Sequence, residues 1–160
     1  MKNYIQKKVS NGNPREQALI RRWWCEKQQG RGLLVWEYNL EGKYADAIWF
    51  PNSDETGERP GKDVKKRFPI RDKEIVLCEA KIELIPWVIG QALVYTRFAI
   101  RAGAHVRETV VFAETGSPSM IEVSEELGLS LEIGAGCDVK FMSRPSQLIG
   151  KAHWDVRPNA

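Results

Sequence analysis

The sequence predicts an α/β fold with a mixed five-stranded sheet flanked by helices on both faces. Two observations indicate this fold class. Segments with the two-residue period of strands alternate with segments of helical period along the chain. Two early strand-like segments lie close enough to form a hairpin, whereas later ones are separated by helices, which is typical of parallel crossover connections. With 160 residues, 42% of them hydrophobic, the chain can bury a substantial core, so we expect a single domain over residues 1–160.

The N-terminal part of the chain predicts a helix followed by a β-hairpin. Asn13 is a suitable N-cap with proline directly after it, so the first helix is expected over residues 14–28. Residues 33–38 combine β-branched and aromatic side chains, and residues 43–50 form a second strand-like segment. Residues 39–42 between them have the composition of a turn, so these two strands should pair antiparallel.

The rest of the chain predicts a long loop and five further elements. Residues 51–73 are rich in Pro, Gly and charged side chains, and inserted loops of this length are usually functional or disordered. The helix expected over residues 86–101 is apolar nearly all round, which predicts packing on more than one side. In chain order, the elements expected after the loop are a strand over 74–81, the helix over 86–101, a strand over 109–113, a helix over 118–127 capped by Ser117, a strand over 139–142 and an irregular tail over 143–160.

Composition excludes several classes of protein. No run of about 18 apolar residues is present, which argues against a membrane span. Residues 1–8 lack the apolar core of a signal peptide. The three cysteines, Cys25, Cys78 and Cys137, lie far apart in the sequence. We therefore expect an intracellular, cytoplasmic protein with buried thiols, and neither a disulfide framework nor a zinc site.

Basic residues concentrate in the first half of the chain. The net charge is only +3, but 16 of the 24 Lys and Arg residues lie in residues 1–75. Lys62, Lys65, Lys66 and Arg67 form a basic stretch in the expected loop, which is typical of contacts with a phosphate backbone. A solvated loop is the alternative interpretation. The neighbouring glycines lack the spacing of a nucleotide-binding phosphate loop, so no nucleotide cofactor is expected.

Two acids and a lysine interrupt otherwise apolar strands. Asp46 lies within the second expected strand, and Glu79 and Lys81 end the third, where residues two apart share a face. The neighbouring strand could bring Asp46 beside them. Two carboxylates together with a backbone carbonyl, such as that of Ala80, form an oxygen ligand set suited to Mg²⁺. A structural cluster of ion pairs is the alternative.

The long helix contributes a further polar pair. Gln91 and Tyr95 are four residues apart, so they lie on one face of the helix expected over residues 86–101. Gln91 can hydrogen-bond to the site or to the substrate backbone, or it can be an ordinary, partly exposed polar residue.

These motifs, Asp46, Glu79-Ala80-Lys81 and Gln91-x-x-x-Tyr95, resemble those of the PD-(D/E)xK nuclease superfamily, and within it the RecB-like group. The resemblance covers about residues 14–142 and implies a restriction-endonuclease-like αβββαβ core. Two features differ from the family pattern: no proline precedes Asp46, and the loop over 51–73 is an insertion.

Roles for individual residues follow from the resemblance. It implies that Asp46 and Glu79 ligate Mg²⁺ or Mn²⁺ and that Lys81 orients or activates the attacking water. Gln91 and Tyr95 would support the site or contact DNA. Family members often add an acid on the first helix, for which Glu16 fits best and Glu26 is the rival.

The function expected from the sequence is a metal-dependent deoxyribonuclease that hydrolyses DNA phosphodiester bonds. A catalytically inactive DNA-binding module on the same fold is one alternative, and a structural protein is another. DNA is the expected partner, and a homodimer could form through the helix over 86–101 or through the irregular tail. Trp24 and Trp49 are out of phase with their apolar neighbours and could stack on bases, although core packing is the commoner role of such aromatics.

Overall fold

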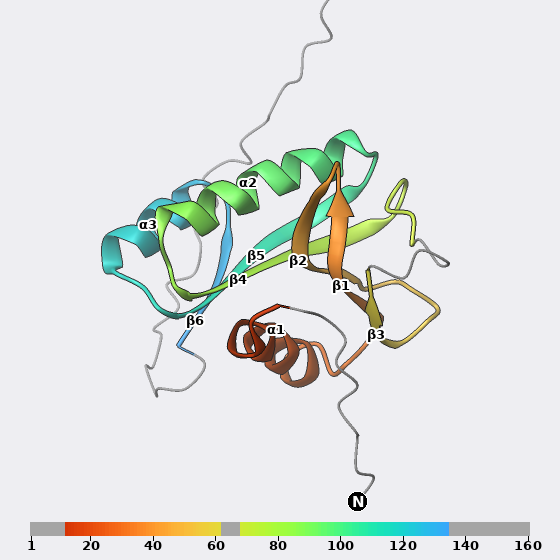
Figure 1. The fold of residues 1–160 in the computed structure, drawn as a ribbon, viewed down its shortest axis with the longest axis horizontal. Coiled ribbons are helices and arrows are strands. Elements are labelled where there is room, and N and C mark those ends of the chain that lie inside the picture. Colours follow the sequence, from red (N-terminus) through yellow and green to blue (C-terminus); the bar gives the residue numbers. More distant parts are fainter. Residues whose placement is uncertain (1–11, 62–67, 135–160) are drawn as a thin grey trace, which may run out of the picture.

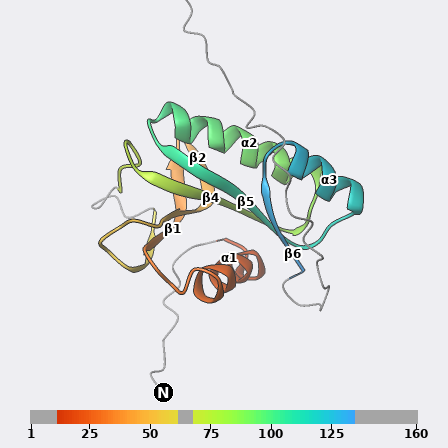
Figure 2. The ribbon, with the colours of Figure 1, turned by 180° about the vertical axis from the view of Figure 1, so that it is seen from behind.

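A computed structural model describes residues 12–61 and 68–134, which form a mixed six-stranded sheet with strand order β3-β1-β2-β4-β5-β6 (Figure 1). Helix α1 covers one face of the sheet, and α2 and α3 lie on the other, as the view from behind also shows (Figure 2). The predicted α/β class, with helices on both faces, is confirmed. The elements are α1 (Pro14–Glu26), β1 (Leu33–Leu40), β2 (Lys43–Phe50), β3 (Gly57–Pro60), β4 (Glu74–Glu83), α2 (Pro86–Arg101), β5 (His105–Thr115), α3 (Pro118–Glu126) and β6 (Ser130–Ile133).

The helix boundaries follow the capping signals in the sequence. The side chain of Asn13 accepts a hydrogen bond from the Arg15 N–H, which satisfies one of the free amides of the first turn. Ser117 caps α3 in the same way by accepting from the Met120 N–H. Helix α1 ends at Glu26, two residues before the expected end.

The strand pairing matches the predicted mixture of directions. β1 and β2 form the expected antiparallel hairpin, and β2 pairs antiparallel with β4. β4 and β5 are parallel, with α2 as their crossover connection, and β5 and β6 are parallel across α3. The sheet is therefore antiparallel on the hairpin side and parallel on the other, so β4 is the strand at which the direction of pairing changes.

Two strands correct the sequence prediction of five. β3 lies inside the segment expected to be a loop and pairs in parallel with β1 at the edge of the sheet. β6, at the opposite edge, is only four residues long and was not predicted. Short edge strands bury little apolar surface, so their periodicity is weak. The strand expected over 139–142 and the tail over 143–160 lie outside the described residues.

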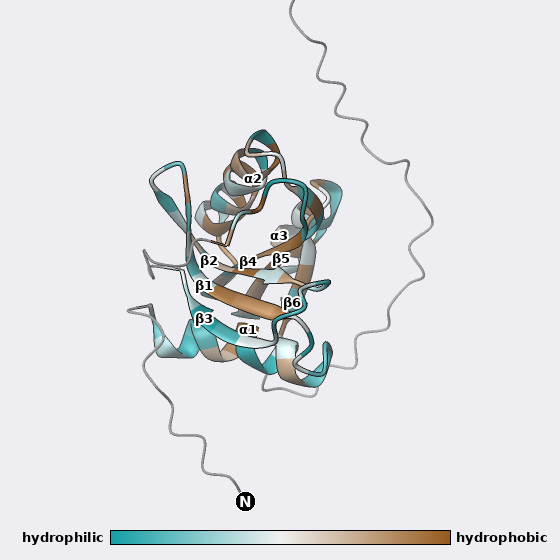
Figure 3. Cartoon of the chain, turned by 90° about the vertical axis from the view of Figure 1, so that its right-hand side faces the viewer, coloured by the Kyte–Doolittle hydropathy of each residue, from teal (hydrophilic) through white to brown (hydrophobic). Residues whose placement is uncertain are grey.

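Apolar side chains pack on both faces of the sheet. On the α1 side, Trp23 lies edge-on to Trp49 and Phe112, each with ring centroids 5.4 Å apart. On the other side, the second half of α2 packs against the hairpin, and its first half packs against β5. Figure 3 shows the hydrophobic central strands between elements such as β3 and much of α1 that are hydrophilic.

The tryptophans of α1 and β2 belong to this core. Trp24 and Trp49 are each buried, and both indole N–H groups donate to the carbonyl oxygen of Arg31, at 2.8 and 2.7 Å. Core packing of these rings, the commoner role at the sequence level, is thus confirmed, and base stacking by them is not supported. Cys25 is exposed, contrary to expectation, because it lies on the outer face of α1, whereas Cys78 is buried. Cys137 lies outside the described residues.

Among the described residues, α2 is packed on one side only, which differs from the expectation of packing on several sides. Val88, Ala92 and Ala99 are buried against the sheet, but the side chain of Trp87 is 69% exposed and that of Val94 is 48% exposed. None of the helices in the described part of the chain is long and apolar enough to cross a membrane.

Candidate active site at the fork between β2 and β4

The backbone ladder between β2 and β4 ends at the pair Ala47 and Cys78. At the next position the two acids predicted from the sequence, Asp46 and Glu79, face the opposite strand. The backbone N–H of Asp46 donates to Oε1 of Glu79 at 3.2 Å, and the N–H of Ala80 donates to Oδ2 of Asp46 at 2.8 Å. Each carboxylate therefore accepts an amide of the neighbouring strand, and the strands diverge beyond this point.

The hairpin is distorted at the same position. Its register pairs Trp36 with Ala47 and Tyr38 with Ala45, and the residues between them, Glu37 and Asp46, form no ladder pair. Glu37 has a left-handed backbone with φ of 51°, a conformation that costs roughly 1 kcal/mol for a side chain other than glycine. This irregularity shifts the alternation of side chains, so the hairpin end packs against the second half of α2.

A small cavity opens beside Asp46 on the α1 side of the sheet. It has a volume of about 50 Å³ and lies between the start of α1 and the bent part of the hairpin. Three of its lining residues carry carboxylates, Glu16, Glu37 and Asp46, and each comes from a different element. Ala80 also lines the cavity. Such a donor set consists only of oxygen atoms, which fits a hard divalent cation such as Mg²⁺.

Lys81 connects β4 to the start of α1. Its Nζ lies 3.4 Å from both carboxylate oxygens of Glu16, and its side chain is 34% exposed, compared with 14% for Glu16. The structure therefore brings the first-helix acid into the site as Glu16. The rival Glu26 is exposed at the other end of α1, ten residues and about 15 Å farther along the helix axis.

Burial raises the pKa of both central acids. The pKa of Asp46 rises from 3.8 to about 6, mainly because burial disfavours the charged form; the Ala80 amide and Lys81 oppose this rise, and Glu16 and Glu37 add to it. The pKa of Glu79 rises well above 4.5, again mainly through burial and then through the nearby charge of Asp46. When the negative charges of two buried acids are not fully balanced by nearby positive charge, the acids bind either protons or a cation.

Gln91 and Tyr95 form the expected pair on α2. The Gln91 Nε2 donates to the Tyr95 hydroxyl at 3.3 Å. Tyr95 is only 8% exposed and packs in the core, which favours a supporting role over a contact with DNA. The Gln91 Oε1 is buried and has no hydrogen-bond partner among the described residues.

The residue that follows Gln91 packs on the strand next to β4. Ala92, which follows Gln91, packs in one cluster with Val111, and Val111 is the β5 partner of Glu79. Buried amide oxygens without a partner are rare in proteins. The oxygen of Gln91 is therefore available to a further hydrogen-bond donor.

Glu37 is the site residue that sequence reasoning did not identify. Along β1 it reads as an ordinary polar residue near a turn. The turn itself contained the missing signal, because antiparallel pairing around residues 41–42 places Glu37 opposite Asp46. The predicted basic residues Lys62, Lys65, Lys66 and Arg67 lie outside the described residues, so their position relative to the site is not assigned.

The described residues contain no group of three or more His, Cys, Asp and Glu side chains arranged as a formed metal site. The two central carboxylates instead accept backbone amides across the fork, so cation binding requires them to turn toward a common point. In comparisons with known proteins, the chain matches no family model, no curated protein and no solved structure. The arguments for a function therefore depend on the geometry of the fork.

Proposed function

We propose that this protein is a metal-dependent deoxyribonuclease with a restriction-endonuclease-like core of the PD-(D/E)xK type. The observation that carries the proposal is the fork between β2 and β4, where Asp46 and Glu79 are held against each other's strand with Lys81 and Glu16 beside them. A purely structural ion-pair cluster would balance these charges. Here burial raises the pKa of both central acids and the nearby Lys81 does not offset this rise, so their ionised forms favour a bound cation.

The cation would be held in the cavity by the carboxylates of Asp46 and Glu16 and by the carbonyl oxygen of Ala80, and Glu79, which does not line the cavity, would turn toward it. When bound, Mg²⁺ or Mn²⁺ polarises a phosphoryl oxygen and lowers the pKa of its water ligand. Lys81 lies beside Glu16, with its Nζ 3.4 Å from the carboxylate, and so borders the proposed cation position. From there it would hold the attacking water or neutralise charge that develops on the phosphate. Gln91 would orient the site from α2 through its buried amide oxygen.

The test is cleavage of circular, linear and single-stranded DNA in Mg²⁺, Mn²⁺ or EDTA. Wild type is compared with Glu79→Gln and Lys81→Ala, and with Glu83→Gln, an exposed acid on the same strand, as the matched control. We expect metal-dependent cutting that is lost in the first two variants and kept in the third. Folding of each variant is checked by circular dichroism.

The alternative function is a DNA-binding module without catalysis. It predicts DNA binding without cleavage under any metal condition, unchanged in Glu79→Gln. The presence of both acids beside a half-buried lysine disfavours it, because carboxylates repel a polyanion unless a cation lies between them.

The missed residue Glu37 gives a prediction about metal affinity. Glu37→Gln removes one of the three carboxylates around the cavity, so Mn²⁺ should bind about 10-fold more weakly, as is typical when a supporting group of a metal site is lost. Titration calorimetry measures this affinity, with Glu83→Gln as the control that should bind normally. Equal affinity in Glu37→Gln and wild type would exclude Glu37 from the cation's surroundings.

A further inference from the structure

Positive charge is unevenly compensated over the described surface. Several arginine and lysine side chains there lie in ion pairs, for example Arg15 with Glu114 at 2.6 Å and Lys27 with Glu132 at 2.6 Å. These pairs neutralise much of the positive charge on and around α1. In the described part of the chain, the exposed side chains of Lys43 and Arg71 have no such acidic partner, and neither do those of Arg31 and Lys73.

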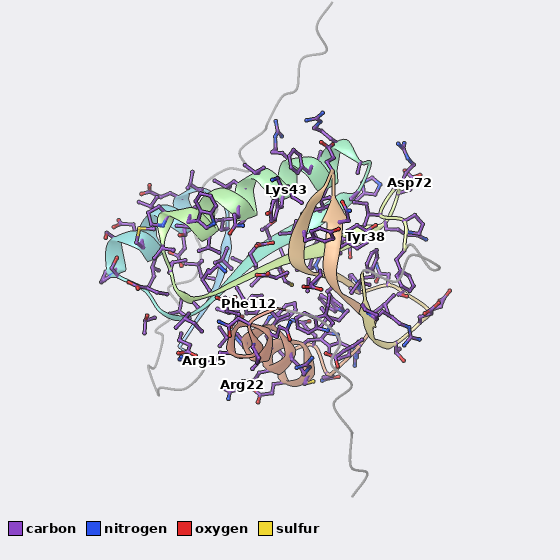
Figure 4. All side chains as sticks on the ribbon, viewed as in Figure 1. Arg15, Arg22, Tyr38, Lys43, Asp72 and Phe112 are labelled. Atoms are coloured by element: carbon purple, nitrogen blue, oxygen red, sulfur yellow. The ribbon has the colours of Figure 1, made fainter. Side chains whose placement is uncertain are left out.

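The fold brings Lys43 and Arg71 to the same end of the molecule. Lys43 begins β2 at the tip of the hairpin, which packs against the second half of α2. Arg71 lies against the end of the same helix, where its side chain approaches Gly103 and where the Asp72 N–H donates to the Gly103 carbonyl at 2.9 Å. In Figure 4, Lys43 lies beside α2, and Arg15 and Arg22 project from α1 on the opposite side.

A third cation completes this surface. The side chain of Arg101, the last residue of α2, is 70% exposed and lies in a long ion pair with Glu41 at 4.0 Å. Lys43, Arg71 and Arg101 are called the hairpin-end cations below. Two exposed acids, Glu41 and Asp72, lie among them, so the surface keeps a net positive charge.

One of the hairpin-end cations, Lys43, lies on the same strand as Asp46. Lys43 is three residues from Asp46 along one strand, which corresponds to at most about 10 Å. Phosphates of one DNA strand repeat about every 3.4 Å along the helix axis. A strand with its reactive phosphate at Asp46 would thus place a phosphate roughly three nucleotides away beside Lys43.

We propose that the hairpin-end cations are a contact surface for the phosphate backbone of the DNA substrate, positioned by the same hairpin that carries Asp46. This proposal rests on the proposed nuclease function. Neutralisation of the α2 dipole explains a basic residue at Arg101. It explains neither Lys43 on a hairpin nor Arg71 in a loop, and the surface accounts for all three.

The experiment measures binding of a fluorescein-labelled duplex by anisotropy in EDTA, at several salt concentrations. Lys43→Ala/Arg71→Ala is compared with Arg22→Ala/Arg31→Ala. This control removes the same charge from α1 and from the loop that precedes β1, at the opposite end of the hairpin. We expect the first variant to bind at least about 10-fold more weakly at 0.1 M salt, with a salt slope lower by about 2. The control should keep the wild-type slope.

The outcomes separate this proposal from the nuclease proposal. The proposed surface would be overturned by equal losses of DNA affinity in both double variants, by an unchanged salt slope in Lys43→Ala/Arg71→Ala, or by no measurable DNA binding of the wild type. A reduced slope without any cleavage in Mg²⁺ would support the surface and count against the nuclease. Cleavage by wild type with an unchanged slope would support the nuclease and overturn the surface alone.

Discussion

Asp46→Asn is expected to abolish DNA cleavage and, at the same time, to make the metal-free protein more stable at pH 7.5. Loss of a carboxylate ligand should lower the rate by about 10³-fold or more, because a bound cation supplies several kcal/mol of transition-state stabilisation. The rise of the Asp46 pKa from 3.8 to about 6 corresponds to an unfavourable free energy of about 3 kcal/mol for the ionised group in the folded state. Asparagine keeps the acceptor for the Ala80 amide and removes this charge.

The measurements are urea denaturation in EDTA at pH 7.5 and a cleavage assay in Mg²⁺. The matched control is Asp54→Asn, an exposed acid that follows the end of β2, which should keep activity and change stability by less than about 0.5 kcal/mol. Asp46→Asn protein that is less stable than wild type would show that the charge of Asp46 is compensated in the folded state. Full cleavage activity would remove Asp46 from the site.

The second large effect is a loss of folding stability as the pH rises, which a divalent cation should reverse. Because burial raises the pKa of Asp46 and of Glu79 above their unfolded values, the folded state binds more protons than the unfolded state above about pH 4. The contribution of these groups to stability is therefore complete below pH 4 and is lost as the pH rises through about 6, by an amount on the order of 3 kcal/mol from Asp46 alone.

Mg²⁺ should stabilise the protein strongly at pH 8 and little at pH 5, because only ionised carboxylates bind it. At 100 times the dissociation constant the gain is about 2.7 kcal/mol. Urea unfolding at both pH values, with EDTA or Mg²⁺, measures this difference, and Asp46→Asn/Glu79→Gln serves as the variant in which it should vanish. Equal stabilisation by Mg²⁺ at pH 5 and pH 8 would contradict a site made of these two acids.

The sequence could predict much of the site because its signals are local. Asp46 and Glu79 interrupt apolar strands, and burial of acids is rare enough to be informative. The capping residues Asn13 and Ser117 marked two helix starts correctly. The first-helix acid stayed ambiguous between Glu16 and Glu26 because a helical pattern does not show which end of the helix meets the sheet.

The remaining features depend on contacts between distant segments. β3 contains glycine, proline and two charged residues, so its composition indicates a loop, and only its pairing with β1 makes it a strand. Proline is tolerated there because an edge strand leaves one row of N–H groups unpaired. Cys25 was expected in the core, but the rotation of α1 about its axis, which is set by Trp23 and Trp24, turns it to the surface.

The exchange of hydrogen bonds across the fork affects how the site can be studied. Because Asp46 and Glu79 accept amides of the opposite strand, their side chains connect β2 and β4 one residue beyond the last backbone ladder pair. Substitution of either acid by alanine would remove these hydrogen bonds and leave the amides unsatisfied. A loss of activity could then not be separated from a local separation of the strands. Asparagine at position 46 and glutamine at position 79 keep an oxygen that accepts the amide. These variants therefore report on the loss of the charge alone.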